Sequence, residues 1–212
     1  MEFITIEKQV ETQIVEKKSK FIANFFPVES VIDAETVIKE IKKKYYDARH
    51  NCIAYRVMED DQIIEKSSDD GEPSGTAGAP MLAILQKNEL ANVVVVVTRY
   101  FGGVLLGTGG LVRAYSDSLL KAIDESVKVY KCEGVEMSVT TTYSDFELFK
   151  YYCKKHQILI TNVEYSDLVI CKIELEVAKK ERLWKDFSTK EINLNDIKEI
   201  TKKYIAKSIE KK

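Results

Sequence analysis

The sequence predicts an α+β protein with two domains, of which the second has a ferredoxin-like fold. The chain has 212 residues, which exceeds the roughly 100 to 150 residues most common for one domain. The pattern of strands and helices starts again around residues 130–134, and the elements that follow have the order βαββαβ. That order is typical of the ferredoxin-like fold. We therefore expect one domain over residues 1–131 and a ferredoxin-like domain with a basic tail over residues 132–212.

The composition indicates a globular protein. Hydrophobic residues make up 45% of the chain and charged residues 31%, which suits a packed core under a charged surface. No apolar run is longer than that of residues 93–97, which is far shorter than the roughly 20 residues of a membrane helix. Residues 1–7 lack the basic and apolar stretches of a signal peptide. We expect a cytoplasmic protein without a membrane partner, whose four widely spaced cysteines are free and buried.

Two strands and a helix are expected first. Residues 3–15 and 20–28 have the composition of strands. The helix over residues 30–46 begins at a capping pair, Ser30 and Asp33. Its apolar residues recur with helical spacing at Ala34, Val37, Ile38, Ile41 and Tyr45.

The remaining elements of the first domain alternate between strands and helices. We expect a strand over 50–58, a helix from Thr76, a strand over 92–98 and a helix over 111–126. Five consecutive valines in the third of these show no polar alternation, which predicts a central strand covered on both faces. Pro80 is compatible only with the first turn of its helix.

The second domain begins with an alternating strand over residues 135–141. A helix capped by Ser144 follows, and then two strands around a tight turn at Ser166 and Asp167. The next helix carries Leu183, Trp184 and Phe187, and the last strand is expected at Ile192 and Leu194. Residues 202–212, with five lysines, are predicted to be a solvated tail.

Two glycine-containing loops form the candidate functional site. Eight of the nine glycines and two of the three prolines lie between Gly71 and Gly110. Because glycine costs backbone entropy on folding, this concentration indicates unusual backbone angles or close backbone approach. We name residues 67–78 the acidic loop and residues 98–110 the glycine loop.

The acidic loop has two interpretations. Its three acids, Asp69, Asp70 and Glu72, could surround a hydrated Mg²⁺, although the spacing of an EF-hand is absent. In the other interpretation the carboxylates and hydroxyls bond to amides of the loop itself and cap the next helix. We expect no metal here.

The glycine loop connects a buried strand to a helix. Unpaired amides at a helix N-terminus favour an anion, to which Arg99 and Arg113 could add charge. The P-loop pattern is absent, and Val112 stands where a dinucleotide-binding motif needs its last glycine. The alternative is that the glycines let helix and sheet pack closely, with Tyr100 and Phe101 in the core.

Catalytic chemistry has little support in the sequence. His50 and Cys52 lie on the same side of a strand, but a packed thiol beside a hydrogen-bonded imidazole explains them as well as a nucleophile and its base. Cys153 and His156 supply two zinc ligands where a structural site needs four. We expect no catalytic residue and no cofactor, and we lean against an enzyme.

Three blocks of the chain resemble the YigZ/Impact family: residues 47–52 (DARHNC), 68–78 (SDDGEPSGTAG) and 97–115 (VTRYFGGVLLGTGGLVRAY). The resemblance implies an N-terminal domain like domain four of elongation factor G and a C-terminal domain like that factor's last domain. Bacterial members have the same two-domain length, whereas eukaryotic Impact proteins would share only the region to about residue 130.

The resemblance also implies a role in translation, because Impact relatives are linked to translational control through an amino-acid-starvation kinase pathway. We expect a regulatory protein that binds RNA, the ribosome or a translation factor. One alternative is an enzyme or sensor for a phosphorylated small molecule that uses both loops, and another is a protein-binding adaptor. The candidate ligand-binding residues are Arg49, His50, Asp69, Asp70, Gly71, Glu72, Thr76, Arg99, Tyr100, Gly102, Gly103, Gly107, Thr108, Gly109, Gly110 and Arg113.

The charge distribution adds a second candidate contact with RNA. The net charge of −2 argues against a protein that coats nucleic acid, but residues 178–212 carry 11 basic and 6 acidic side chains, a net charge of +5. Tyr143, Tyr165 and Trp184 on the predicted strands could stack on bases. Alternatively, Trp184 fills the core and the lysines keep the tail soluble.

Overall fold

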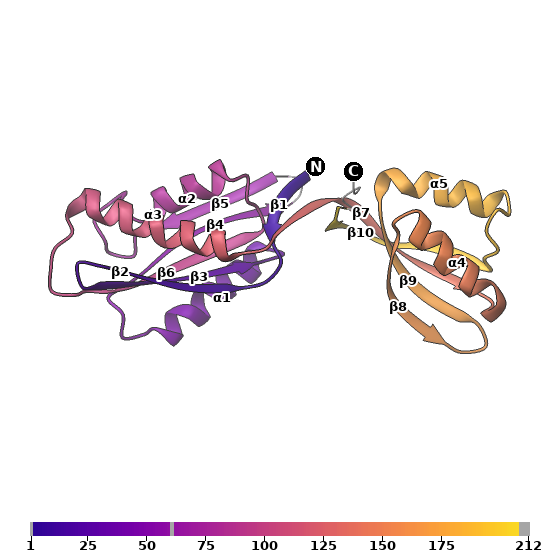
Figure 1. Ribbon diagram of the computed structural model, residues 1–212, viewed down its shortest axis with the longest axis horizontal. Coiled ribbons are helices and arrows are strands. Elements are labelled where there is room, and N and C mark those ends of the chain that lie inside the picture. Colours follow the sequence, from indigo (N-terminus) through magenta and orange to yellow (C-terminus); the bar gives the residue numbers. More distant parts are fainter. Residues whose placement is uncertain (1, 60–61, 208–212) are drawn as a thin grey trace. The chain divides into compact units, whose positions relative to one another are not determined.

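The computed structural model describes residues 2–59 and 62–207, which form an α+β protein with two compact units (Figure 1). The N-terminal unit is Phe3–Val129. The C-terminal unit contains the described residues from Tyr130 onward, together with Glu2. The α+β fold class is confirmed, whereas the assignment of domains to residues 1–131 and 132–212 stays a prediction.

The N-terminal unit is built on a five-stranded antiparallel sheet with the order β2-β3-β6-β4-β5. The strands are β2 (Val10–Glu16), β3 (Ser19–Pro27), β4 (His50–Glu59), β5 (Gln62–Ser68) and β6 (Val93–Tyr100). The valine run lies in β6, in the middle of the sheet, which confirms the prediction of a central strand. Val93, Val95 and Val97 face one hydrophobic core, and Val94 and Val96 face another.

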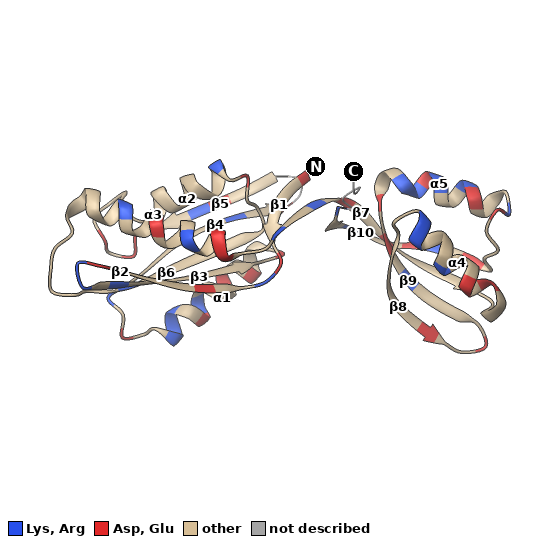
Figure 2. Ribbon diagram, viewed as in Figure 1, with Lys and Arg blue, Asp and Glu red and all other residues tan. Residues whose placement is uncertain are grey.

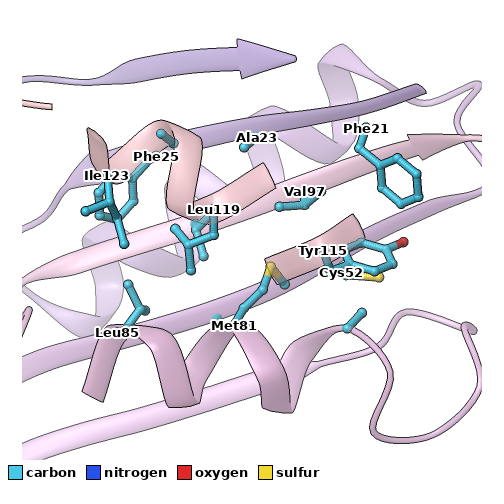
Figure 3. Packing of buried hydrophobic residues seen from close by; sticks show 14 of the residues in the cluster. Phe21, Ala23, Phe25, Cys52, Met81, Leu85, Val97, Tyr115, Leu119 and Ile123 are labelled. Atoms are coloured by element: carbon cyan, nitrogen blue, oxygen red, sulfur yellow. The ribbon is translucent and has the colours of Figure 1, made fainter. Parts of the chain in front are cut away.

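Helices cover both faces of this sheet. α1 (Val31–Lys44) packs on one face, and α2 (Gly78–Lys87) and α3 (Gly107–Glu125) pack on the other. The side chain of Ser30 caps α1 by accepting from the Asp33 amide at 3.1 Å, as predicted. Figure 3 shows the core beneath α2 and α3, which includes Phe21, Phe25, Met81, Leu85 and Leu119.

Two expectations for this unit were wrong, and one strand was missed. Residues 3–15 form two strands, β1 (Glu2–Ile6) and β2, rather than one. The edge strand β5 was missed, because its isoleucines Ile63 and Ile64 are exposed and the strand lacks a buried alternating face. α3 begins at Gly107 rather than at residue 111, so the last glycines of the glycine loop belong to the first helical turn.

The C-terminal unit has the predicted order βαββαβ. Its elements are β7 (Lys128–Thr141), α4 (Tyr143–Lys155), β8 (Leu159–Tyr165), β9 (Val169–Glu176), α5 (Val177–Ser188) and β10 (Asp196–Ala206). The strands are antiparallel in the order β10-β7-β9-β8. Alternate side chains of β7 and β9 pack with the helices around Met137, Ile173, Phe149 and Leu183.

The end of the chain differs from the expected tail. Residues 202–206 belong to β10, where Lys202 pairs with Val135 and Ile205 with Cys132. The expected last strand at Ile192 and Leu194 is wrong, since these residues precede β10 and pack against the core. Because β10 carries exposed lysines, its sequence lacks the regular alternation of apolar and polar residues that predicts a strand. Residues 208–212 lie outside the described part of the chain.

The aromatic residues proposed for RNA stacking do not all lie on strands of the C-terminal sheet. Tyr143 begins α4 and Trp184 lies on α5, whereas only Tyr165 lies on a strand, β8. The rings of Tyr143 and Tyr165 stack with centroids 6.1 Å apart. The prediction of an aromatic platform on the strands was therefore wrong.

All four cysteines are free and buried, as predicted. Burial raises the pKa of Cys52 and of Cys153 to about 12 and that of Cys171 to about 11. These thiols stay protonated at neutral pH. Within the described residues, no helix combines the length and apolar character needed to cross a membrane.

Candidate functional site

The acidic loop and the glycine loop lie at the same end of the N-terminal sheet (Figure 1). At this end β6 finishes at Tyr100, β4 begins at His50 and β3 begins at Ser19, since His50 pairs with Arg99 and Lys20 with Tyr100. The acidic loop follows β5, the neighbour of β4. The structure therefore brings together the two loops that the sequence predicted as one site.

Asp69 uses its carboxylate to hold the acidic loop in place. One oxygen accepts from the Gly75 amide at 2.8 Å, and the other accepts from the amides of Ala77 at 2.9 Å and Gly78 at 2.8 Å. Burial alone would raise the pKa of Asp69. The hydrogen bonds from the three amides together outweigh burial, so the pKa is below its ordinary value. Asp69 thus stays ionised and caps the start of α2.

Asp70 ties the acidic loop to β4 and α1. Its carboxylate accepts from the Asn51 amide at 2.7 Å and from the Lys42 ammonium at 2.6 Å. Nδ1 of His50 donates to the Asp70 carbonyl at 2.9 Å. Burial opposes ionisation, but Lys42 and the Asn51 amide hold the pKa of Asp70 below its ordinary value.

Glu72 and Arg99 form a buried ion pair that joins the two loops. Oε1 of Glu72 accepts from Nη1 of Arg99 at 2.7 Å and from the Tyr115 hydroxyl at 2.9 Å. The Glu72 side chain is 3% exposed and that of Arg99 is 7% exposed. Burial, with Cys52 and Glu72 nearby, raises the pKa of Tyr115 far above its ordinary value. His50 Nε2 lies 3.9 Å from the same Glu72 oxygen.

Arg99 is enclosed by aromatic rings. Its guanidinium lies 5.5 Å from the ring centre of Phe21 and 5.6 Å from that of Phe101. The Phe21 ring in turn meets Tyr115 edge to face, with centroids 5.2 Å apart (Figure 3). Arg99 is therefore neutralised inside the protein and does not supply the exposed charge expected beside α3.

Arg113 is the arginine that the structure places at the start of α3. It is exposed and lines a pocket of about 130 Å³ with Gly110 and Lys17. Glu16 and Asp117 line the same pocket, so its formal charges balance. The N-terminus of α3 has no side-chain cap, which leaves the anion interpretation of the glycine loop as a proposal.

Gly102 supports the packing interpretation of the glycine loop. A Cβ atom on this residue would lie 2.0 Å from the backbone carbonyl carbon of Lys18. The Gly102 amide also donates to Oγ of Ser19 at 3.2 Å. Gly103 and Gly107 have φ angles of 84° and 73°, which favour glycine. By contrast, a Cβ on Gly109 would meet nothing within 4 Å.

Cys52 is a packed thiol rather than a nucleophile. Its Sγ donates to the Asp69 carbonyl at 3.0 Å, and its pKa is about 12 because of burial. Over the described ranges, no three His, Cys, Asp or Glu side chains are grouped so that they could hold a metal ion. The carboxylates of the acidic loop are bonded to amides and cations of the protein.

The other candidate residues have separate roles. The Thr76 hydroxyl is buried and donates to the Pro73 carbonyl at 2.6 Å. The Tyr100 hydroxyl donates to Asp47 at 2.7 Å, and this bond raises the pKa of Tyr100 to about 12. Gly71 follows Asp70 with a φ angle of 86°. Arg49 and Thr108 are exposed.

The outward side chains at this end of the sheet were largely missed by sequence reasoning. We define the tip surface as the exposed residues Lys17, Lys18, Arg49, Phe101, Val104 and Leu105. Leu105 is 82% exposed, and Figure 2 shows basic residues at the β2–β3 turn. The pair of lysines between two expected strands was the available signal for this turn. The three acids of the acidic loop are therefore bonded within the protein, whereas the residues of the tip surface are exposed.

Comparisons with known proteins cover both units. The Impact N-terminal domain model matches residues 17–123, and a domain of unknown function, DUF1949, matches residues 139–188. The IMPACT family member YvyE of Bacillus subtilis is 37% identical over 209 residues, which cover 98% of this chain and 95% of YvyE. YigZ of Escherichia coli is 35% identical over 164 residues, 77% of this chain and 80% of YigZ. A crystal structure described as a hypothetical protein has a TM-score of 0.63 and 32% identity, and covers 91% of this chain and 96% of its own.

Proposed function

The chain belongs to the IMPACT family, and on this premise we propose that it is a translation-associated regulatory protein rather than an enzyme. Its partner is RNA, the ribosome or a translation factor, and the tip surface is the binding face. The family premise supports the link to translation. The chemistry of the tip surface favours RNA among these partners.

One observation carries the proposal: the acids of the acidic loop are bonded internally, while exposed basic and apolar side chains gather in the tip surface. Asp69 and Asp70 accept five hydrogen bonds between them from protein groups. A metal ion held by these carboxylates would compete with those bonds. Lys17, Lys18 and Arg49 remain exposed for phosphates, and the exposed ring of Phe101 suits stacking on a base.

The loops also hold the tip surface in a defined geometry. The buried pair of Glu72 and Arg99 connects the acidic loop to the glycine loop. The close approach of Gly102 to Lys18 connects the glycine loop to the β2–β3 turn. Because these segments are ordered before binding, less conformational entropy is lost when a partner binds.

RNA binding by the tip surface is tested with fluorescence anisotropy on a labelled single-stranded RNA of about 20 nucleotides. Replacing both Lys17 and Lys18 by alanine should weaken binding and reduce the salt slope of log affinity by about 1.4, since each lost phosphate contact contributes about 0.7. The matched control replaces Lys39 and Lys43, two exposed lysines of α1, by alanine. Equal affinities for the two double variants would refute the tip surface as an RNA site.

The translation link itself is tested by co-sedimentation with Bacillus subtilis ribosomes. Wild-type protein should pellet with the ribosomes, and the Lys17 and Lys18 double variant should remain in solution. Retention of both proteins in the supernatant, together with capture of a translation factor, would replace RNA by a protein partner. Absence of binding to RNA, to ribosomes and to a translation factor would favour the alternative function of a protein-binding adaptor.

A second candidate function rests on the uncapped start of α3. The amides of its first turn have no side-chain cap, and with Arg113 and Lys17 nearby they suit a phosphate group. Saturable stabilisation by inorganic phosphate or AMP, lost on Arg113→Ala, would favour a sensor or enzyme for a phosphorylated small molecule. Because Glu16 and Asp117 balance the charge of this pocket, we rank this function second.

A further inference from the structure

A pocket of about 360 Å³ opens between α1 and the β2–β3 edge of the N-terminal sheet. α1 packs over β4 and β6 through Ile38, Val57 and Val94, which leaves part of the same sheet face uncovered. The residues that line the pocket include Glu11, Asn24, Phe26, Glu40, Ile41 and Lys44. We name it the Asn24 pocket; none of its lining residues belongs to the tip surface.

Asn24 is the unusual residue of this pocket. It is 2% exposed, and its side-chain Nδ2 has no hydrogen-bond partner within the part of the chain that the structure describes. The neighbours Ala23 and Phe25 face the core under α2 and α3, so Asn24 points to the opposite face, toward α1. A buried donor without an acceptor destabilises the folded state. An acceptor oxygen supplied from outside the protein would satisfy it.

The other polar side chains decide the charge of a suitable ligand. The Glu11 carboxylate accepts from Lys44 at 2.7 Å and from the Tyr45 hydroxyl at 3.2 Å. The bond to Lys44 outweighs burial and holds the pKa of Glu11 below its ordinary value. Glu40 adds an exposed carboxylate at the rim. Two carboxylates against one ammonium give the lining a formal charge of −1, which disfavours phosphates and favours a cationic nitrogen.

We propose that the Asn24 pocket binds an α-amino amide, the chemistry of leucinamide or of a peptide amino terminus. The carbonyl oxygen accepts from Nδ2 of Asn24, and the protonated amine faces Glu40 and Glu11. The apolar side chain packs against Phe26 and Ile41, which line the same pocket. The volume of about 360 Å³ lies at the small end of the range for ligand pockets, about 300 to 1,000 Å³.

Nuclear magnetic resonance tests this inference on the ¹⁵N-labelled full chain. Titration with leucinamide to about 10 mM should shift the side-chain amide signal of Asn24 in a saturable manner. N-acetyl-leucinamide, which keeps the carbonyl and side chain but lacks the cationic amine, should leave the signal unchanged. Absence of saturation with leucinamide, or equal shifts with both compounds, would overturn the proposal.

A third compound, the tripeptide Leu-Gly-Gly, distinguishes the two sources of this chemistry. Binding of the tripeptide as tightly as leucinamide means that the pocket accepts peptide amino termini. Binding of leucinamide alone means that it accepts only a small molecule. Either result agrees with the proposed chemistry, whereas binding of neither compound contradicts it.

Two variants connect the binding to the named side chains. Asn24→Leu should abolish the binding of leucinamide and raise the Tm by about 3 °C, since the unpaired donor is removed from the interior. Glu40→Gln, at an exposed position that should not affect folding, should weaken binding about fivefold. Its matched control is Glu29→Gln, outside the pocket. Retained leucinamide binding by Asn24→Leu, or unchanged affinity for Glu40→Gln, would show that these side chains do not serve a ligand.

Discussion

The loop end of the N-terminal unit and the open face of the C-terminal sheet use charged residues in opposite ways. In the loops, buried acids organise the backbone, and the lysines of the β2–β3 turn remain exposed. In the C-terminal unit, lysines that the sequence placed in a solvated tail form ion pairs. Lys203 pairs with Glu136 at 2.8 Å and with Glu174 at 2.5 Å, and Lys207 pairs with Glu2 at 2.6 Å. The net charge of a segment therefore does not predict a free basic surface.

The position of a lysine in the fold explains this difference. Lys203 lies on β10, and its neighbours across the sheet on β7 and β9 carry carboxylates. Lys17 and Lys18 lie in a turn between β2 and β3, with φ angles of 44° and 67°. A turn projects its side chains away from neighbouring strands, so charge there is less readily paired.

The largest expected effect comes from breaking the buried ion pair of the N-terminal unit. Arg99→Ala leaves the Glu72 carboxylate buried without its cation, which should lower the free energy of unfolding by about 3 to 5 kcal/mol. Urea denaturation of the full chain measures this loss. The control is Lys198→Ala, which removes an exposed pair with Asp196 and should cause no measurable change. Similar stabilities for the two variants would contradict the contrast between the regions.

Asp69→Asn should have the next largest effect. Its three bonds to backbone amides predict that the variant lowers the free energy of unfolding by about 1 to 2 kcal/mol. Asp124→Asn, an exposed change on α3, is the control. An unfolding midpoint equal to that of wild type would show that the acidic loop does not depend on this carboxylate.

The pH dependence of stability provides a second measurement on Asp69. Its pKa in the folded protein is below the ordinary value of 3.8, so its bonds stabilise the fold above pH 4 or so. This contribution is lost as the pH falls through the folded-state pKa. Stability of Asp69→Asn should therefore decline less between pH 5 and about pH 2 than that of wild type. Parallel curves would mean that other carboxylates account for the acid sensitivity.

Lys203→Ala should have a smaller effect, confined to folding. Two carboxylates, Glu136 and Glu174, lose their shared cation. We expect the free energy of unfolding to fall by about 1 kcal/mol, because these ion pairs are partly exposed to solvent. RNA affinity and its salt dependence should remain those of wild type, unlike in the Lys17 and Lys18 double variant. A reduced salt slope for Lys203→Ala would make the C-terminal unit an RNA contact after all.

The smallest expected effect is a gain in stability from Gly109→Ala. Gly109 is exposed in the first turn of α3, where a Cβ would meet nothing within 4 Å. Alanine should stabilise the helix by about 0.5 to 1 kcal/mol. Loss of phosphate binding without loss of stability would support an anion site at this turn, and thermal unfolding with and without phosphate measures both.

Much of the fold could be predicted because its strongest patterns come from burial. The valine run showed a strand covered on both faces, and alternation in β7 and β9 showed the C-terminal sheet. The edge strand β5 and the final strand β10 were missed because each exposes many charged or polar side chains. Exposed strands of this kind obtain their order from neighbouring strands, which local sequence patterns do not reveal.

The proximity of the two loops could be predicted from the sequence, whereas most of the bonds that hold them could not, and their role as a site stays a prediction. The conspicuous glycines and acids marked both loops, and the capping interpretation of Asp69 agrees with its bonds. The pairing of Glu72 with Arg99, which are 27 positions apart, depends on the tertiary fold. The same holds for Gly102 against Lys18, since a backbone contact between distant segments leaves no periodic pattern.

Because the loops are held by buried side chains, substitutions in this region fall into two kinds. Substitutions at Glu72, Arg99 or Gly102 disturb the support of the loops, whereas substitutions at Leu105 or Lys17 alter only side chains that project into solvent. The outer residues can therefore be exchanged while the supporting framework is retained. One framework of this kind can acquire a different binding preference through a few surface substitutions, and libraries that vary only the tip surface should yield mostly folded proteins.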